Sequence, residues 1–181
     1  DQRLIKEIEH QPAGLVYQRW NRQRLPELSP GDVILEESTY SPLATLRGSL
    51  GSLSYFQVIH PRELREDLSI STFAHVDLNQ MIYQLRGDEE SVIGRTRRVI
   101  KGALVEAEEP LHNVRGVLII FCAGCFLAVE DRIEEIRRGV NEEIPNIPVL
   151  CQFTFGEQGV FPDGECVHGN LMISVILFID G

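Results

Sequence analysis

Three short segments in the last third of the chain contain side chains that could bind a ligand or react. The first segment holds Cys122 and Cys125, two thiols separated by two small residues. The second holds the carboxylate of Glu157 directly after a glycine, and the third holds an imidazole and an amide. Thiols, a carboxylate and an amide around one cavity can fix a small polar ligand by hydrogen bonds. The predicted ligand-binding residues are Cys122, Cys125, Gly156, Glu157, His168 and Asn170.

The elements around these segments predict that all three meet at one edge of a sheet. Residues 117–121 are a continuous apolar run, typical of a strand buried on both faces, and residues 149–155 are a second strand. An amphipathic helix connects them, so a right-handed crossover makes the strands parallel and brings their carboxyl ends to the same edge. Open α/β sheets bind ligands at that edge. The last strand, residues 171–179, returns from it, so His168 and Asn170 are expected there too.

The connecting helix has its own pattern. Glu134 and Arg138 are spaced to pair on its outer side. The turn after Cys122 directs backbone N–H groups into the same space as the candidate side chains, which suits a carboxylate or phosphate. The residues predicted on the core side of the helix are Val129, Ile133, Ile136 and Val140.

The chain before residue 110 is predicted to contain strands, a helix after Pro12 and a longer helix after Asp88. Residues 53–60 and 68–74 alternate as two antiparallel strands joined through residues 61–67, and residues 25–51 form a long connection. Asp88 is a good cap for a helix that runs to about Pro110. We therefore predict one α/β domain over residues 1–181. Its mixed β-sheet is flanked by helices, antiparallel in the first half and with a parallel βαβ unit at 117–155.

Composition excludes several classes of function. A formal net charge of −10 argues against nucleic acid as a partner, and the basic cluster Arg95–Lys101 reads as a solvated helix face. No segment is long and apolar enough to cross a bilayer, and we expect no signal peptide. Four cysteines do not make a disulfide scaffold, so we expect reduced thiols and a cytoplasmic protein. The chain opens on Asp1 rather than Met, so we expect a piece of a longer protein.

The order of these motifs resembles the carboxyl-terminal half of the FIST domain of F-box and intracellular signal transduction proteins. The resemblance rests on Arg115–Gly124, on Ile147–Gly159 with its phenylalanine-glycine-glutamate turn, and on His168–Asn170 before the final strand. It extends upstream to Gln11-Pro12-Ala13 and to Ser41-Pro42-Leu43, and so covers nearly the whole chain.

The resemblance implies an intracellular sensory domain that binds a small ligand, amino acids among them, and that is not an enzyme. It places Cys122, Gly156, Glu157 and Asn170 at the family's characteristic positions. The expected partners are the amino-terminal FIST half or another signalling domain, and no cofactor or metal is expected. Cys125 departs from the family, which often has arginine there, and this weakens an amino-acid assignment if that arginine binds a ligand carboxylate.

Two other interpretations remain open for the cysteines. Cys122 and Cys125 lie between a strand and a helix, as in thiol–disulfide redox proteins. Together with Cys151, Cys166 and His168 they would also supply enough ligands for zinc. A hydrolytic triad of Cys122, His168 and Glu157 can be drawn, but the residues around Cys122 match no nucleophile motif.

Overall fold

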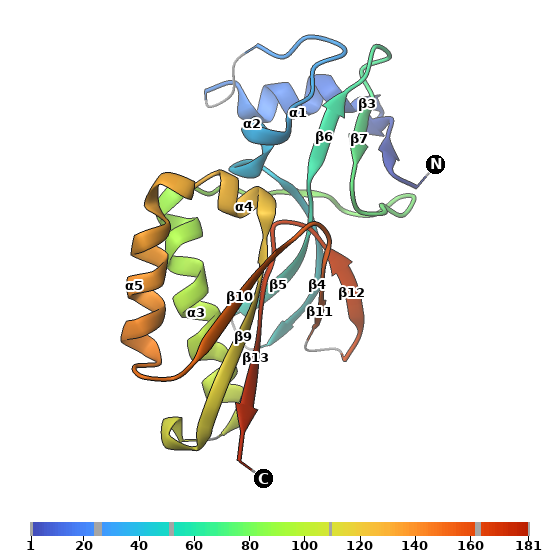
Figure 1. Cartoon of the computed structure of the whole chain (residues 1–181). Coiled ribbons are helices and arrows are strands. Elements are labelled where there is room, and N and C mark those ends of the chain that lie inside the picture. The colour runs from blue at the N-terminus through green and yellow to red at the C-terminus, as the bar shows by residue number, and fades with distance from the viewer. Residues whose placement is uncertain (1, 24–26, 51–52, 109, 162–163, 181) are drawn as a thin grey trace. The chain divides into compact units, whose positions relative to one another are not determined.

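The computed structural model describes residues 2–23, 27–50, 53–108, 110–161 and 164–180. The chain divides into two compact units. The first contains residues 1–86 and 159–170, and the second contains residues 87–158 and 171–181. Each unit is described by itself, and Figure 1 shows the elements of both.

The first unit is built from short strands and two helices. Three sheets have the strand orders β1-β7-β6, β2-β3 and β5-β4-β8, and β12 pairs with β11 (Glu157–Val160), which crosses the unit boundary. Its elements are β1 (Leu4–Ile5), β2 (Glu7–Ile8), β3 (Gln11–Pro12), α1 (Ala13–Asn21), α2 (Leu35–Thr39), β4 (Leu43–Leu50), β5 (Leu53–Ile59), β6 (Pro61–Leu64), β7 (Ile70–Thr72), β8 (Tyr83–Gln84) and β12 (Cys166–Gly169).

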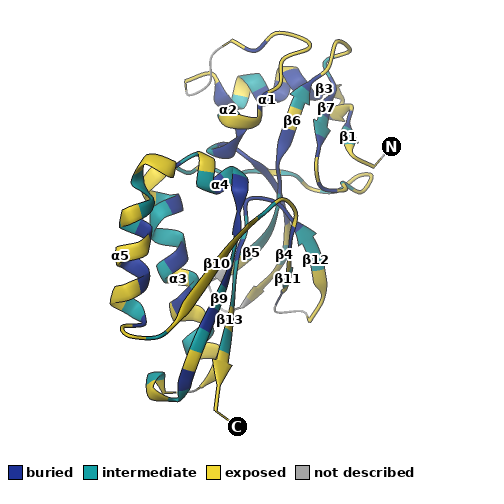
Figure 2. Ribbon diagram, in the orientation of Figure 1, coloured by how far each residue is buried: buried dark blue, intermediate teal, exposed yellow. Residues whose placement is uncertain are grey.

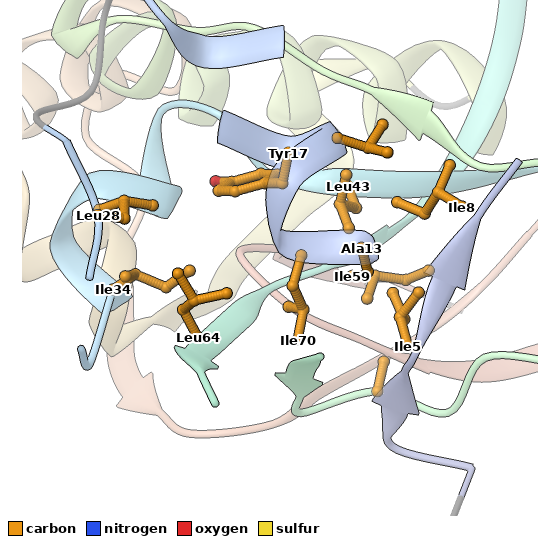
Figure 3. Close-up of a cluster of buried hydrophobic side chains, with 12 residues drawn as sticks. Ile5, Ile8, Ala13, Tyr17, Leu28, Ile34, Leu43, Ile59, Leu64 and Ile70 are labelled. Carbon is orange, nitrogen blue, oxygen red and sulfur yellow. The ribbon is translucent and has the colours of Figure 1, made fainter. Parts of the chain in front are cut away.

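The core of the first unit packs around helix α1. Figure 3 shows Tyr17 among buried aliphatic side chains from β1, β4, β5, β6 and β7. The Tyr17 hydroxyl donates to the carbonyl oxygen of Ser41 at 2.9 Å, which satisfies the one polar atom of this large buried side chain. Burial is also the main reason why the pKa of Tyr17 is raised.

The second unit packs a long helix against a three-stranded sheet of order β10-β9-β13, and a second helix packs against the first. Strand β9 is parallel to β10 and antiparallel to β13. Its elements are α3 (Glu89–Ala107), the 3-10 helix η1 (Leu111–Asn113), β9 (Val114–Cys122), α4 (Ala123–Leu127), the 3-10 helix η2 (Glu130–Arg132), α5 (Ile133–Glu143), β10 (Val149–Thr154) and β13 (Ile173–Ile179).

Local sequence explains why α3 begins at Glu89 and packs on α5. The carboxylate of Asp88 accepts a hydrogen bond from the backbone N–H of Ser91 at 2.8 Å, so it caps the helix as predicted. Arg97 on α3 donates to Glu143 on α5 at 2.9 Å. Gly139 faces Arg97, and a Cβ atom at Gly139 would lie 2.8 Å from the Arg97 Cδ atom, so glycine allows this close approach.

The sheet of the second unit differs in burial from its centre to its edge. Val117, Ile119 and Phe121 of β9 are buried, whereas five of the six β10 residues are exposed. Figure 2 shows β10 as an exposed ribbon beside the darker β9. Among the described residues, β10 pairs only with β9 and is an edge strand. None of the described helices is long and apolar enough to span a membrane.

The predicted fold class is confirmed. The mixed α and β structure is present, and the parallel pair lies where the strand–helix–strand pattern placed it, with Val149 opposite Val117 and Thr154 opposite Cys122. The capped helix after Asp88 is also confirmed, although it ends at Ala107. The strands are distributed over several small sheets.

The predicted hairpin between residues 53–60 and 68–74 is wrong. Strand β5 pairs with β4, which lies inside the predicted connection 25–51, and β7 pairs with β6 and β1. Alternation identified the strands but not their partners. The chain from Pro61 to Leu64 is itself extended, so it starts a new strand instead of closing a turn. Residues 25, 26 and 51 lie outside the described part of the chain.

Two details of the connecting helix also differ. The helix is divided into α4, η2 and α5, yet Val129, Ile136 and Val140 are buried as predicted, while Ile133 is half-buried. Glu134 pairs with Arg137 at 2.7 Å, not with Arg138, because neighbours three apart on a helix are also within reach.

Candidate functional site

The two candidate thiols lie at the junction of β9 and α4. Cys122 is the last residue of β9, and Cys125 lies in the first turn of α4, so the chain reverses from strand to helix between them. Both cysteines are free and buried, with 7% of Cys122 exposed and 1% of Cys125.

The two thiols differ in acidity because they are hydrogen-bonded to each other. The pKa of Cys122 is lowered, chiefly because the Cys125 thiol donates to its sulfur, although burial and the negative charge of Glu157 oppose this shift. The same hydrogen bond is the main cause of the raised pKa of Cys125, and burial is the second cause. The pair therefore ionises first at Cys122, with the remaining proton held on Cys125.

Arg95 brings a positive charge to Cys125 from helix α3. Its Nη1 atom donates to the carbonyl oxygen of Leu171 at 2.6 Å and lies 4.0 Å from the Cys125 sulfur. This charge partly opposes the raised pKa of Cys125. The prediction that Arg95–Lys101 is only a solvated face is therefore wrong at Arg95, whereas Lys101 is exposed as predicted and its amine forms a surface ion pair with Glu143 at 3.2 Å. A basic cluster in sequence does not show which of its members point inward.

Glu157 is the buried carboxylate of the site. Only 2% of it is exposed, and its Oε1 atom accepts a hydrogen bond from the Thr154 hydroxyl at 3.0 Å. Its Oε2 atom is buried and has no hydrogen-bond partner among the described residues. Gly156, with a φ of 95°, supplies the left-handed conformation that turns the chain from β10 into β11. The phenylalanine-glycine-glutamate turn is short, because β11 begins at Glu157.

The second unit therefore contains one cluster of polar and reactive side chains, which we call the Cys–Glu cluster. Thr154 is opposite Cys122 across the parallel pair, so both lie at the carboxyl ends of their strands. Glu157 is near enough to both cysteines for its charge to raise their pKa values. The members of the Cys–Glu cluster are Arg95, Cys122, Cys125, Thr154 and Glu157.

His168 and Asn170 belong to the first unit, where the structure gives them backbone-supporting contacts. The Asn170 Oδ1 atom accepts from the backbone N–H of His60 at 3.2 Å, and its Nδ2 donates to the carbonyl oxygen of Gly169 at 3.0 Å. The carbonyl oxygen of His168 accepts from the side chain of Gln57 at 2.8 Å. The single pocket expected for all six candidate residues stays a prediction: Cys122, Cys125, Gly156 and Glu157 share one unit.

Sequence reasoning missed Arg95 and Thr154. Thr154 directly precedes the phenylalanine-glycine-glutamate turn, so the spacing of Thr154 and Glu157 across Gly156 could have indicated a hydroxyl–carboxylate contact. Arg95 lies far from the other members in sequence, and no local pattern points to it. Within the described residues, no group of three His, Cys, Asp or Glu side chains is arranged to hold a metal ion. Cys151 and Cys166 are exposed.

Comparison with known proteins identifies the family of this chain. The family model of the FIST C domain matches residues 13–160, which includes every member of the Cys–Glu cluster and ends before His168. No curated protein and no solved structure matches the chain. Because the family match covers far more than half of the sequence, the chain belongs to the FIST C family, whose domains are sensory domains of signalling proteins.

Proposed function

We propose that this domain senses a small ligand that carries an ammonium group, and that Glu157 is the residue that binds it. The supporting observation is the buried Oε2 atom of Glu157, which has no partner among the described residues. An unpaired buried carboxylate oxygen costs free energy, and an N–H donor from a ligand removes that cost. A charge-assisted hydrogen bond from an ammonium group is the strongest such donor.

The ligand class that fits best is the amino acids. Arg95 places a guanidinium group 4.0 Å from the Cys125 sulfur, beside the position where other family members often have arginine. A positive group from α3 can therefore replace that arginine and attract the ligand carboxylate, while Glu157 takes the ammonium group. The two thiols then line the site between the charged groups. This arrangement favours recognition over catalysis, and we assign no catalytic step to it.

The signal would pass to a partner domain of the same intracellular signalling system. Ligand contact with Glu157 would move the turn at Gly156, which directly follows β10. Val149, Leu150 and Phe153 of β10 are exposed, and the strand contains no charged residue. Such an uncharged edge is suited to adding a strand from a partner, for which the amino-terminal FIST half is our candidate.

The proposed binding is tested by calorimetry with the standard amino acids and with small monocarboxylates that lack an amine. For the amino acid that binds best, we expect Glu157→Gln to weaken binding about 10- to 150-fold, since a hydrogen bond to a charged group contributes about 1.5–3 kcal/mol. The N-acetylated form of the same amino acid should lose binding to a similar extent, because it lacks the ammonium group.

A matched control is Glu106→Gln, which removes one negative charge from an exposed residue of α3. This variant should bind like the unmodified protein. Equal affinity of Glu157→Gln and Glu106→Gln for every amino acid would show that Glu157 is not the binding group. Tight binding of the monocarboxylates alone would instead assign the site to a carboxylate ligand.

A further inference from the structure

The Cys122–Cys125 pair has a second chemical capacity that ligand binding does not use. The two residues are separated by two positions, at the end of a strand and in the first turn of the following helix. Their sulfur atoms are joined by a thiol–thiol hydrogen bond. Both thiols are free, and each differs from Cys151 and Cys166, which are exposed and lie on separate strands.

We propose that Cys122 and Cys125 form a thiol–disulfide exchange site whose co-reactant is a low-molecular-weight disulfide. The proposal rests on the contact between the two thiols, their unequal burial and the neighbouring Arg95. It does not depend on Glu157 binding an amino acid, and it predicts a stoichiometric change of oxidation state, not a turnover reaction.

The geometry assigns different roles to the two thiols. Cys122 is the more exposed thiol, at 7% against 1%, and it accepts the hydrogen bond from Cys125. The thiolate is the nucleophile in disulfide exchange, so the residue with the lowered pKa and the greater exposure attacks first. Cys125, buried and holding the remaining proton, is in place to resolve the product.

The reaction has two balanced steps. In the first, the Cys122 thiolate attacks one sulfur of the small disulfide; a new S–S bond forms, the old one breaks, and one thiolate leaves and is protonated by water. In the second, Cys125 loses its proton to water and attacks the Cys122 sulfur, which releases the second small thiolate. The protein dithiol is oxidised to a disulfide, and the small disulfide is reduced to two thiols.

Arg95 is the positioning residue for the second step. Cys125 must ionise before it can attack, and both its hydrogen bond with Cys122 and its burial oppose ionisation. Formation of the mixed disulfide converts Cys122 from a thiolate into a neutral sulfur, which removes the first obstacle. The guanidinium group of Arg95, 4.0 Å from the Cys125 sulfur, then favours the new thiolate.

The test uses the full chain with Cys151→Ser and Cys166→Ser, which removes the two exposed thiols. The folded protein is treated with bis(2-hydroxyethyl) disulfide, and its intact mass is measured over time. We expect loss of two hydrogen atoms and no retained adduct. Adding Cys125→Ser should trap one 2-hydroxyethylthio group on Cys122 as a mixed disulfide, and adding Cys122→Ser should abolish the reaction. Adding Arg95→Gln should prolong the adduct stage, and Arg95→Lys should restore its resolution.

Circular dichroism on each variant shows whether it is folded. If Cys122→Ser or Cys125→Ser does not fold, peptide mass mapping of the acid-quenched Cys151→Ser, Cys166→Ser protein identifies the cysteine that carries the transient adduct. The proposal is overturned if neither thiol reacts until the protein is unfolded, if the adduct forms on Cys125 first, or if the adduct persists without forming the disulfide. Since no amino acid is present, these outcomes are separate from those of the binding experiment.

Discussion

The hydrogen bond between Thr154 and Glu157 should contribute more to the free energy of unfolding when residue 157 is charged than when it is neutral. Thr154 is the only described partner of the Glu157 carboxylate, through a 3.0 Å bond to Oε1. Hydrogen bonds to charged groups contribute about 1.5–3 kcal/mol, and neutral ones about 0.5–1.5 kcal/mol. Thr154→Val should therefore destabilise the protein by about 2 kcal/mol, but by only about 1 kcal/mol when combined with Glu157→Gln.

Glu157→Gln alone should stabilise the ligand-free protein by about 1 kcal/mol, because a buried unpaired amide costs less than a buried unpaired carboxylate. For a chain of this length, that raises the unfolding midpoint by about 2–4 °C. Urea unfolding followed by circular dichroism gives all four free energies of the double-mutant cycle. An equal cost of Thr154→Val in both backgrounds, or a loss of stability in Glu157→Gln, would refute the claim that Glu157 is buried and underpaired.

Three further predictions concern the scaffold. Burial lowers the pKa of His60, so the unfolded state binds a proton at a higher pH than the folded state does. The free energy of unfolding should therefore fall as the pH drops below about 6.5. In urea titrations His60→Gln should remove this pH dependence, whereas the control His75→Gln, at an exposed residue, should not. Gly102→Ala should stabilise α3 by about 0.5–1 kcal/mol, because no atom lies within 4 Å of the new Cβ atom. Gly139→Ala should be less stable than Gly102→Ala by about 1–3 kcal/mol, because its Cβ atom would contact Arg97. Thermal unfolding of the two variants measures this difference. Leu150 is 65% exposed, so Leu150→Lys should change the free energy of unfolding by less than about 0.5 kcal/mol. The same substitution should prevent co-purification with the amino-terminal FIST half. Undiminished co-purification would argue against β10 as the contact.

The parallel unit could be predicted from sequence because its signals are local. A continuous apolar run at β9, an amphipathic connection and a second strand leave one common topology, and the register then brings Thr154 beside Cys122. The cap at Asp88 is likewise determined by a few adjacent residues. In each case, the neighbours in sequence provide the physical constraint.

The first half could not be predicted in the same way because its pairings are not local. Strand β4 lies in a stretch whose proline, glycine and serine content suggested a connection, and only the long ladder with β5 makes it a strand. Arg95 was missed for a related reason. Its partners, Leu171 and Cys125, are distant in sequence, so its inward direction is decided by how α3 packs on the sheet and not by the residues around it.

Glu157 connects the two proposals through a single charge. Its carboxylate raises the pKa of Cys122, so an ammonium group bound at Oε2 should offset that effect and increase the fraction of Cys122 thiolate. Binding must then favour reaction with the small disulfide, and by linkage the ionised thiol must favour binding of the ammonium ligand. The first adduct on Cys122 should form faster with a bound amino acid than without it at pH 7. In Glu157→Gln the same amino acid, at a concentration that saturates the variant, should leave the rate unchanged. If an amino acid binds tightly but slows the formation of the adduct, then it covers Cys122 instead of activating it. That result would separate ligand sensing from the thiol chemistry.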